Sequence, residues 1–537
     1  MLRVSILGVA ALYLMACTSD GSDERDYRPE VGQVRAAIGN QDKNDFRERK
    51  TENKLMTKRK ADCDNDPRVV LGLVSSDICV GADLFFREPF GGNGRACGSC
   101  HAAQFDFTIS PEFIASLEPD DPLFVAENDP NLTQLEKPEL MRDFGLILEN
   151  VDGAEDPTNK FVMRSVPHCF SLKTSITPAP IVNPDGTGVD GTTQPPIERT
   201  GWGGDGAPAP GGLKQFQAGA IFQHYTKSLA RVAGTDFIEA TDEQLTDIEK
   251  FLLSIGRTED IDLDSYTLSD PAAETGRTTF RDSRCNGCHH NAGAQTNPGP
   301  QNNPVFNGNF DTGIEAVRIT DLDDMSIPHD GGFGGAAPGD PFNHDADGDG
   351  LLDSYGKGTF STTPLFEAAD TGPFFHTNAF TTIEDAIRFY TEPAFANSAA
   401  GGGNAIPFGD TDIENVGKFL RVLNASFNCK LAIARLQAET KINTNYKNQW
   451  KGLQYGLLDA AQAEIRDALA DLSQVGINAG AVTQLTTADQ EITTAFANSS
   501  HGQRLAHAQA ALAAVLAADA SLGTGLDFTV GPGSIMF

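Results

Sequence analysis

The sequence is short of positive charge. Its 537 residues include 41 Lys and Arg against 74 Asp and Glu, which gives a formal net charge of −33 and excludes nucleic acid as a partner. Methionine is also rare, with seven residues, and tryptophan occurs twice. Hydrophobic residues make up 39% and charged residues 21%, which excludes global disorder, and the lack of repeated long apolar runs excludes a multi-pass membrane protein.

The N-terminal 60 residues are predicted to form an export signal followed by a spacer. A positive start at Arg3 precedes an apolar run over 4–16 that is too short to span a bilayer. A small residue followed by Cys17 resembles the bacterial lipobox, so residues 1–17 are predicted to be a lipoprotein signal; an ordinary secretory signal is the alternative. Residues 18–60 are polar and charge-rich and predict a flexible tether. We expect a lipid-anchored protein on the periplasmic side of the bacterial envelope, at the outer membrane because no Asp follows Cys17.

Four of the nine cysteines belong to two C-x-x-C-H patterns, at 97–101 and 285–289. In this pattern two thiols add to the two vinyl groups of one porphyrin and the adjacent His reaches the iron, which is the attachment signature of c-type haem. A redox C-x-x-C pair would be expected near a βαβ pattern, and a zinc site needs two further ligands at matched spacing. The sequence therefore predicts two covalently bound haems, held by Cys97, Cys100, His101, Cys285, Cys288 and His289.

Four further cysteines remain besides Cys17. In an oxidising compartment they allow up to two disulfides, but three pairings are possible and the sequence does not choose among them. Cys63 with Cys79 is the local option, and Cys169 and Cys429 complete the set.

The pattern of apolar residues predicts a mainly α protein with long loops. Helical spacing occurs in 213–232, 242–255, 383–390, 413–423, 449–472 and 503–517, and a helix start stands at Pro271. No stretch alternates like a strand over any length. The predicted regions are 61–257 and 258–429, each with one haem motif, and a helical C-terminal appendage over 430–537.

The two motifs, about 190 residues apart, resemble those of the bacterial di-haem cytochrome c peroxidases and their MauG-type relatives. Further matching segments are 84–86, 164–167, 276–280, 372–376 and 381–390. The resemblance implies two cytochrome c-like haem domains and an oxidoreductase that reduces hydrogen peroxide or uses it to oxidise a partner.

The resemblance also assigns axial ligands. His101 would be the proximal ligand of the haem that meets peroxide, and His289 would hold the haem that stores or relays an electron. The other ligand of the second haem lies fourteen residues past the His of a P-Y-F-H-type segment, which is Tyr390 here. Classical peroxidases have Met at this position and MauG-type enzymes have Tyr, so the chain reads as MauG-type. A phenolate favours ferric iron.

Two more residues match catalytic positions of the family. Trp202 resembles the tryptophan that relays electrons between the haems; the alternative is a core tryptophan. The family's catalytic Glu should fall near Thr226, but no Glu occurs between Thr200 and Phe237. His224 is the nearest acid–base substitute, with a helix-surface His as the alternative. Loss of the Glu also resembles the rubber-cleaving di-haem oxygenases, which activate dioxygen.

Calcium has two candidate sites. In the family an ion between the domains is held partly by backbone carbonyls matching Thr371 and Pro373, and Ser165 stands where Asn is usual. A separate D-x-D-x-D-G segment, with Gly356 where an EF-hand has Glu, suits calcium or is an acidic solvated turn. Its candidate ligands are Asp345, Asp347, Asp349 and Asp353.

Two classes of function remain open at this point. The first is an enzyme, either peroxide-dependent or, as a variant, activating dioxygen. The second is a non-catalytic electron-transfer cytochrome. No His occurs between His101 and Pro167 to block the first iron, which favours an enzyme. The acidic surface predicts a basic periplasmic cytochrome or a basic substrate protein as partner.

Overall fold

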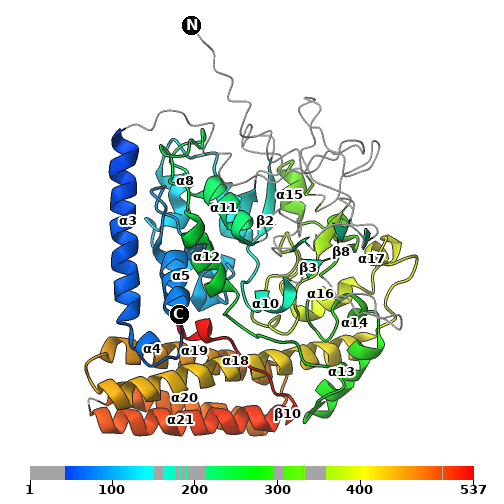
Figure 1. The fold of residues 1–537 in the computed structure, drawn as a ribbon. Helices are drawn as coiled ribbons and strands as arrows, with labels where there is room; N and C mark the ends of the chain where they lie inside the picture. The colour runs from blue at the N-terminus through cyan, green and yellow to red at the C-terminus, as the bar shows by residue number, and fades with distance from the viewer. Residues whose placement is uncertain are drawn as a thin grey trace.

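The computed structural model describes residues 43–149, 161–176, 178–179, 181–182, 189–190, 197–198, 213–295, 307–327, 329–330, 332, 358–498 and 500–537. Within them the chain is mainly helical, as predicted, and its strands form only short antiparallel pairs (Figure 1). The lipoprotein signal, the tether up to residue 42, Trp202 and the acidic loop 345–353 lie outside the described residues.

The first region is organised around two crossing helices, α5 (Ser76–Arg87) and α12 (Asp242–Leu252). Ser75 begins α5 by accepting a hydrogen bond from a backbone N–H of the first turn. The helices approach so closely that a Cβ atom on Gly81 would lie 1.9 Å from the carbonyl oxygen of Asp247, so only glycine fits there. The other helices of this region are α4 (Pro67–Val70), α6 (Cys97–Cys100), α7 (Pro111–Ser116), α8 (Val125–Asn128), α9 (Pro138–Phe144), α10 (Leu172–Ser175) and α11 (Leu213–His224).

Part of the predicted tether is helical. Helix α3 (Lys43–Asp64) includes residues 43–60 and lies against α5, so the tether prediction is corrected over that span (Figure 1). Arg59 is paired with Asp83 and with Glu88, 2.9 Å away, which fixes the C-terminal half of α3 on α5. Polar composition alone indicated a flexible chain, but these tertiary ion pairs stabilise the helix.

The local disulfide is present. Cys63 at the end of α3 is bonded to Cys79 on α5, with 5.8 Å between the Cα atoms. Cys169 and Cys429 are free and buried, so the second disulfide that the even number of cysteines allowed does not form.

The second region repeats the crossing of the first. Helix α13 (Pro271–Asp282) packs against α18 (Asp410–Tyr446), and a Cβ atom on Gly276 would lie 1.8 Å from the carbonyl oxygen of Asn415. In both regions, therefore, a glycine at a helix crossing precedes the haem motif. The remaining helices of this region are α14 (Cys285–Cys288), α15 (Thr320–Asp324), α16 (Ile383–Phe389) and α17 (Pro393–Asn397).

Short strands and 3₁₀ turns connect these helices. The strands pair as β1 (Leu146–Glu149) with β2 (Val162–Ser165), β3 (Pro178–Ala179) with β6 (Ile197–Glu198), β4 (Ile181–Val182) with β5 (Val189–Asp190), β7 (Thr267–Leu268) with β10 (Gly523–Thr524), and β8 (Asn309–Asp311) with β9 (Thr359–Ser361). The 3₁₀ turns are η1 (Ala103–Phe105), η2 (Pro122–Phe124), η3 (Ile314–Ala316) and η4 (Pro532–Ile535).

The C-terminal region is an α-helical bundle joined to the second region without a break. Helix α18 crosses the boundary predicted between residues 429 and 430 and packs against α19 (Lys451–Gln474) and α21 (His501–Leu522), while α20 (Ala479–Ala497) packs against α19 and α21 (Figure 1). The predicted separation is therefore corrected, because the bundle shares one continuous hydrophobic core with the helices of the two preceding regions. Of the helices that the structure describes, α21 alone is long and apolar enough to cross a membrane; its buried residues pack in the bundle.

The segment after α21 returns to both haem-motif regions. Strand β10 pairs with β7, and the carbonyl oxygen of Ser254 accepts a hydrogen bond from the backbone N of Gly533 at 2.9 Å. Phe537 then enters the aromatic core of the first region, where its ring centroid lies 4.8 Å from that of Phe107. The C-terminal region is thus packed into the body of the protein rather than appended to it.

Candidate haem sites

Both C-x-x-C-H motifs form the same short helical turn, α6 and α14. The backbone N of His101 donates to the carbonyl oxygen of Cys97 at 2.9 Å, and that of His289 donates to Cys285 at 2.9 Å. The two histidines end their turns with nearly equal backbone angles, φ −97° and ψ 70° for His101 and φ −106° and ψ 63° for His289. Each turn places both thiols and the imidazole on one short stretch of chain.

Each imidazole is oriented by a backbone carbonyl. Nδ1–H of His101 donates to the oxygen of Phe107 at 2.9 Å, and Nδ1–H of His289 donates to the oxygen of Thr363 at 2.9 Å. This leaves Nε2 as the nitrogen with a free lone pair, which is the ligating form of a histidine. Burial lowers the pKa of His101 and lowers that of His289 to about 4, so both rings are neutral at neutral pH.

The four motif thiols are free and half-buried. Burial raises the pKa of Cys97 to about 11, of Cys100 to about 12 and of Cys288 to about 11, so they remain thiols. The hydroxyl of Tyr225 donates to Sγ of Cys97 at 3.1 Å. Two free thiols, which can form thioether bonds with the porphyrin vinyl groups, occur twice beside an imidazole with an available Nε2, and these residues fit a covalently attached haem.

Tyr390 lies beside the second motif. It follows α16 and packs in an aromatic cluster with Phe375, Phe389 and Phe395, which Cys285 also contacts. Burial, with smaller contributions from the Cys288 and Cys285 sulfurs, raises the pKa of the Tyr390 phenol. The tyrosine identified by its spacing from His376 therefore lies near the second motif, although it follows Cys288 by 102 residues in the chain.

Cys169 lies beside the first motif, and sequence reasoning did not foresee this. Its sulfur is 3.4 Å from Nδ1 of His101, on the side of the ring that faces Phe107. His168, the first histidine after His101, is also buried and interacts electrostatically with His101, and burial lowers the pKa of His168 to about 4. No local pattern marks either position, because the contact forms only when the segment after β2 folds onto the loop after α6.

His224 ends helix α11 close to the first motif. Its backbone oxygen accepts a hydrogen bond from Nδ2 of Asn93 at 2.9 Å. Burial lowers its pKa to about 3, and the positive charges of Arg95 and Arg231 add to this effect. Its imidazole is therefore neutral at neutral pH. Helix α11 stops at His224, eight residues before the predicted end at Val232.

The interdomain calcium set is brought together only in part. The hydroxyl of Ser165 donates to the oxygen of Phe375 at 3.1 Å, which places Ser165 at the loop that contains Thr371 and Pro373. Two carbonyls and a hydroxyl are fewer than the six to eight oxygen ligands that calcium takes, so other oxygens would have to complete such a site. Within the described part of the chain, no group of three His, Cys, Asp or Glu side chains is arranged to hold a metal ion.

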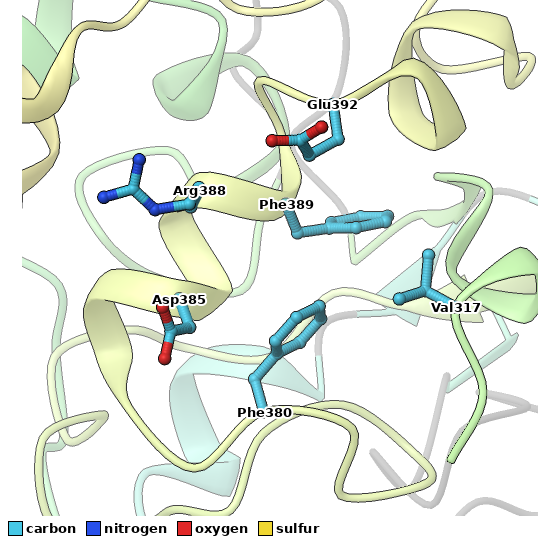
Figure 2. Close-up of a pocket in the computed structure, with 6 residues that line it drawn as sticks. All are labelled: Val317, Phe380, Asp385, Arg388, Phe389 and Glu392. Carbon is cyan, nitrogen blue, oxygen red and sulfur yellow. The ribbon is translucent and has the colours of Figure 1, made fainter. Parts of the chain in front are cut away.

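A shallow pocket of about 240 Å³ lies on the outer side of α16. Figure 2 shows the side chains of Phe380, Phe389 and Val317 around it, with Asp385, Arg388 and Glu392 at its rim. Arg388 is already paired with Asp410 at 2.7 Å. None of the predicted site residues lines this pocket, and we assign it no ligand.

Comparison with protein-family models, with curated proteins and with solved structures found no match to this chain.

Proposed function

We propose that this protein is a di-haem c-type oxidoreductase of the cytochrome c peroxidase and MauG type. It would reduce hydrogen peroxide, or use peroxide to oxidise a partner, with one haem held by Cys97, Cys100 and His101 and the other by Cys285, Cys288 and His289. The observation that carries the proposal is the repetition of one local geometry at two distant places in the chain.

The surroundings of the two motifs support two cytochrome c-like domains. Each motif follows a helix whose glycine, Gly81 or Gly276, allows close contact with a second helix. Each imidazole donates Nδ1–H to a carbonyl oxygen from a later loop. A pair of crossing helices with an anchored histidine ligand is the arrangement that a small haem domain needs.

The reaction requires electrons, protons and a path for both. One peroxide takes up two electrons and two protons to give two waters, and a bound haem supplies the redox-active iron for this exchange. The imidazole of His224 would be the nearest acid–base group, and because its pKa is lowered to about 3 it is a weak base that would hold a proton only transiently between the two peroxide oxygens. Tyr390 would complete the ligand set of the second haem, and Trp202 would relay electrons between the two haems.

The proposed setting follows from the remaining predictions. Cys17 would carry the lipid anchor at the periplasmic face of the outer membrane, and calcium would bind at the acidic loop 345–353. The formal charge of −33 favours a basic cytochrome or a basic substrate protein as partner.

Activation of dioxygen is the second candidate. Thr226 stands where the family has its catalytic Glu; it is fully buried, and its hydroxyl donates to the backbone oxygen of Ser228 at 2.5 Å. No carboxylate is therefore available at that position to assist O–O cleavage, which favours an oxidant other than peroxide.

Optical and EPR spectra of the protein with bound haem, recorded before and after addition of peroxide or dioxygen, test the proposal. A peroxidase-type enzyme should give one high-spin and one low-spin ferric haem and should oxidise a reduced cytochrome only when peroxide is present. Two low-spin haems that respond to neither oxidant would identify an electron-transfer cytochrome instead. Histidine to glutamine substitution at His224 should slow turnover with peroxide while leaving the resting spectra unchanged.

A further inference from the structure

We propose that Phe537 is a positioning residue for the first haem, acting through Phe107 on the iron ligand His101. The C-terminal region would thereby set the reduction potential of that haem. This inference rests on the proposed function, since it concerns the ligand of a bound haem.

The hydrogen bond at issue joins Nδ1–H of His101 to the backbone oxygen of Phe107, with 2.9 Å between the two atoms. A hydrogen bond at Nδ1 orients the imidazole and makes Nε2 a stronger electron donor to a metal. Stronger donation favours the ferric state and lowers the reduction potential. Contacts that fix the position of the Phe107 carbonyl therefore also influence the reduction potential of the first haem.

The loop that presents this carbonyl has an unfavourable backbone conformation. Asp106 and Phe107 are consecutive non-glycine residues in the left-handed region, with φ angles of 51° and 61°. Such residues persist only where the surrounding structure holds them. The loop after the first motif must therefore be fixed by contacts from outside it.

The C-terminal region makes one of these contacts through Phe537. The Phe107 ring is completely buried, and among the rings around it that of Phe537 is closest, edge-on at 86° with 4.8 Å between centroids. Phe170 follows at 5.1 Å. The guanidinium of Arg435 on α18 covers the Phe537 ring at 4.8 Å from its centroid. The aromatic ring is thus held between the bundle and the loop.

Hydrogen bonds from three different parts of the chain hold the segment that carries Phe537. Nε of Arg435 donates to the oxygen of Ser534 at 3.2 Å, and Nη1 of Arg68 donates to the oxygen of Ile535 at 2.9 Å. The hydroxyl of Ser534 accepts from the backbone N of Gly256 at 3.1 Å. These bonds leave little freedom for Phe537 to move away from Phe107.

The neighbouring loop residue also faces the bundle. The half-buried carboxyl group of Asp106 interacts electrostatically with Asp370, and with Glu464 and Asp467 on α19. Arg435 pairs with Glu464. Of the two left-handed residues of the loop, Phe107 therefore contacts the C-terminal region, and Asp106 interacts with it electrostatically.

The test compares Phe537→Ala with Phe496→Ala. Phe496 is an equally half-buried ring on α20 that stacks on Tyr455 at 5.7 Å within the bundle, so it controls for loss of a ring in the same region. The full chain is loaded with haem, covalent attachment is checked by mass, and both reduction potentials are measured by spectroelectrochemistry. The Fe–His stretching frequency of the ferrous first haem is recorded by resonance Raman.

We expect Phe537→Ala to shift the potential of the first haem upward and to lower its Fe–His frequency, with the second haem unchanged. Phe537→Tyr should restore both values because it keeps the ring. Unchanged values for the first haem in Phe537→Ala would overturn the inference, as would an equal shift in Phe496→Ala or of both haems together. A wild-type chain with no covalently bound haem would overturn the proposed function and this inference with it.

Discussion

The sulfur of Cys169 lies 3.4 Å from Nδ1 of His101, the same ring nitrogen that donates to the Phe107 carbonyl. Cys169 is buried and burial raises the pKa of its thiol, so it stays a neutral thiol packed against the proposed iron ligand. In the oxidising compartment expected for the chain, burial would limit the access of oxidants to this sulfur. A buried thiol packed against His101 is also kept away from a partner cysteine.

Counting thiols gives a direct test of haem attachment. Cys63 and Cys79 form a disulfide. The other six cysteines of the described residues are free when no haem is attached: Cys97, Cys100, Cys169, Cys285, Cys288 and Cys429. If both haems are attached, alkylation of the denatured, unreduced chain should modify Cys169 and Cys429, and Cys17 only where its sulfur carries no lipid. Mass spectrometry of the alkylated peptides measures this. The folded protein should react at neither Cys169 nor Cys429, and modification at the motif cysteines would contradict covalent attachment.

Replacing Tyr390 by Phe should change the second haem alone. The ring and its contacts with Phe375 and Phe395 are retained, while the oxygen that would bind iron is lost. In EPR spectra of the resting protein, we expect the low-spin ferric signal of the second haem to be lost and a different signal of that haem to take its place. The signal of the first haem should not change. Phe389→Leu in the same aromatic cluster serves as the control for packing. If the low-spin signal survives in Tyr390→Phe, the ligand assignment is wrong.

Stability should fall as pH rises from about 4 to about 8 through Asp467. Burial raises the pKa of Asp467 to about 8, and the carboxylates Asp370 and Glu464 add to the effect. The folded protein therefore keeps a proton that the unfolded chain, with its usual pKa of 3.8, has already lost. Asp467→Asn should flatten this pH dependence and raise the free energy of unfolding at pH 8 by on the order of 1 kcal/mol.

Urea unfolding at several pH values measures this effect. Asp459→Asn is the matched control, because Asp459 is an exposed carboxyl group on the same helix α19. An Asp467→Asn variant whose stability changes with pH as steeply as the wild type would show that Asp467 loses its proton normally in the folded state.

Turnover with a basic electron donor should depend on salt. The formal charge of −33 would attract a basic protein, and exposed charges are screened beyond about 10 Å at 0.1 M ionic strength. We expect the second-order rate with a basic cytochrome to fall as ionic strength rises, and the rate with a small neutral donor to stay constant. A rate with the basic cytochrome that is flat across the same range would show that the acidity serves only solubility.

Much of the local structure could be read from the sequence. The haem motifs depend on residues within five positions, and a C-x-x-C-H turn brings its thiols and imidazole together whatever the rest of the chain does. Helices with clear apolar periodicity, such as α12 and α16, were predicted close to their observed bounds for the same reason. The Cys63–Cys79 disulfide joins neighbouring helices and was the local option among three pairings.

The features that the sequence did not determine depend on contacts between distant segments. The carbonyl of Thr363 reaches His289 from 74 residues away, Arg59 converts part of a polar spacer into a docked helix, and α18 passes through a predicted boundary. Most of all, Phe537 lies on Phe107 across more than 400 residues. Periodicity and motif spacing indicate interactions within one element. The contacts above form between elements that are distant in the chain, because apolar surfaces pack together and buried charges are paired only when the whole chain folds.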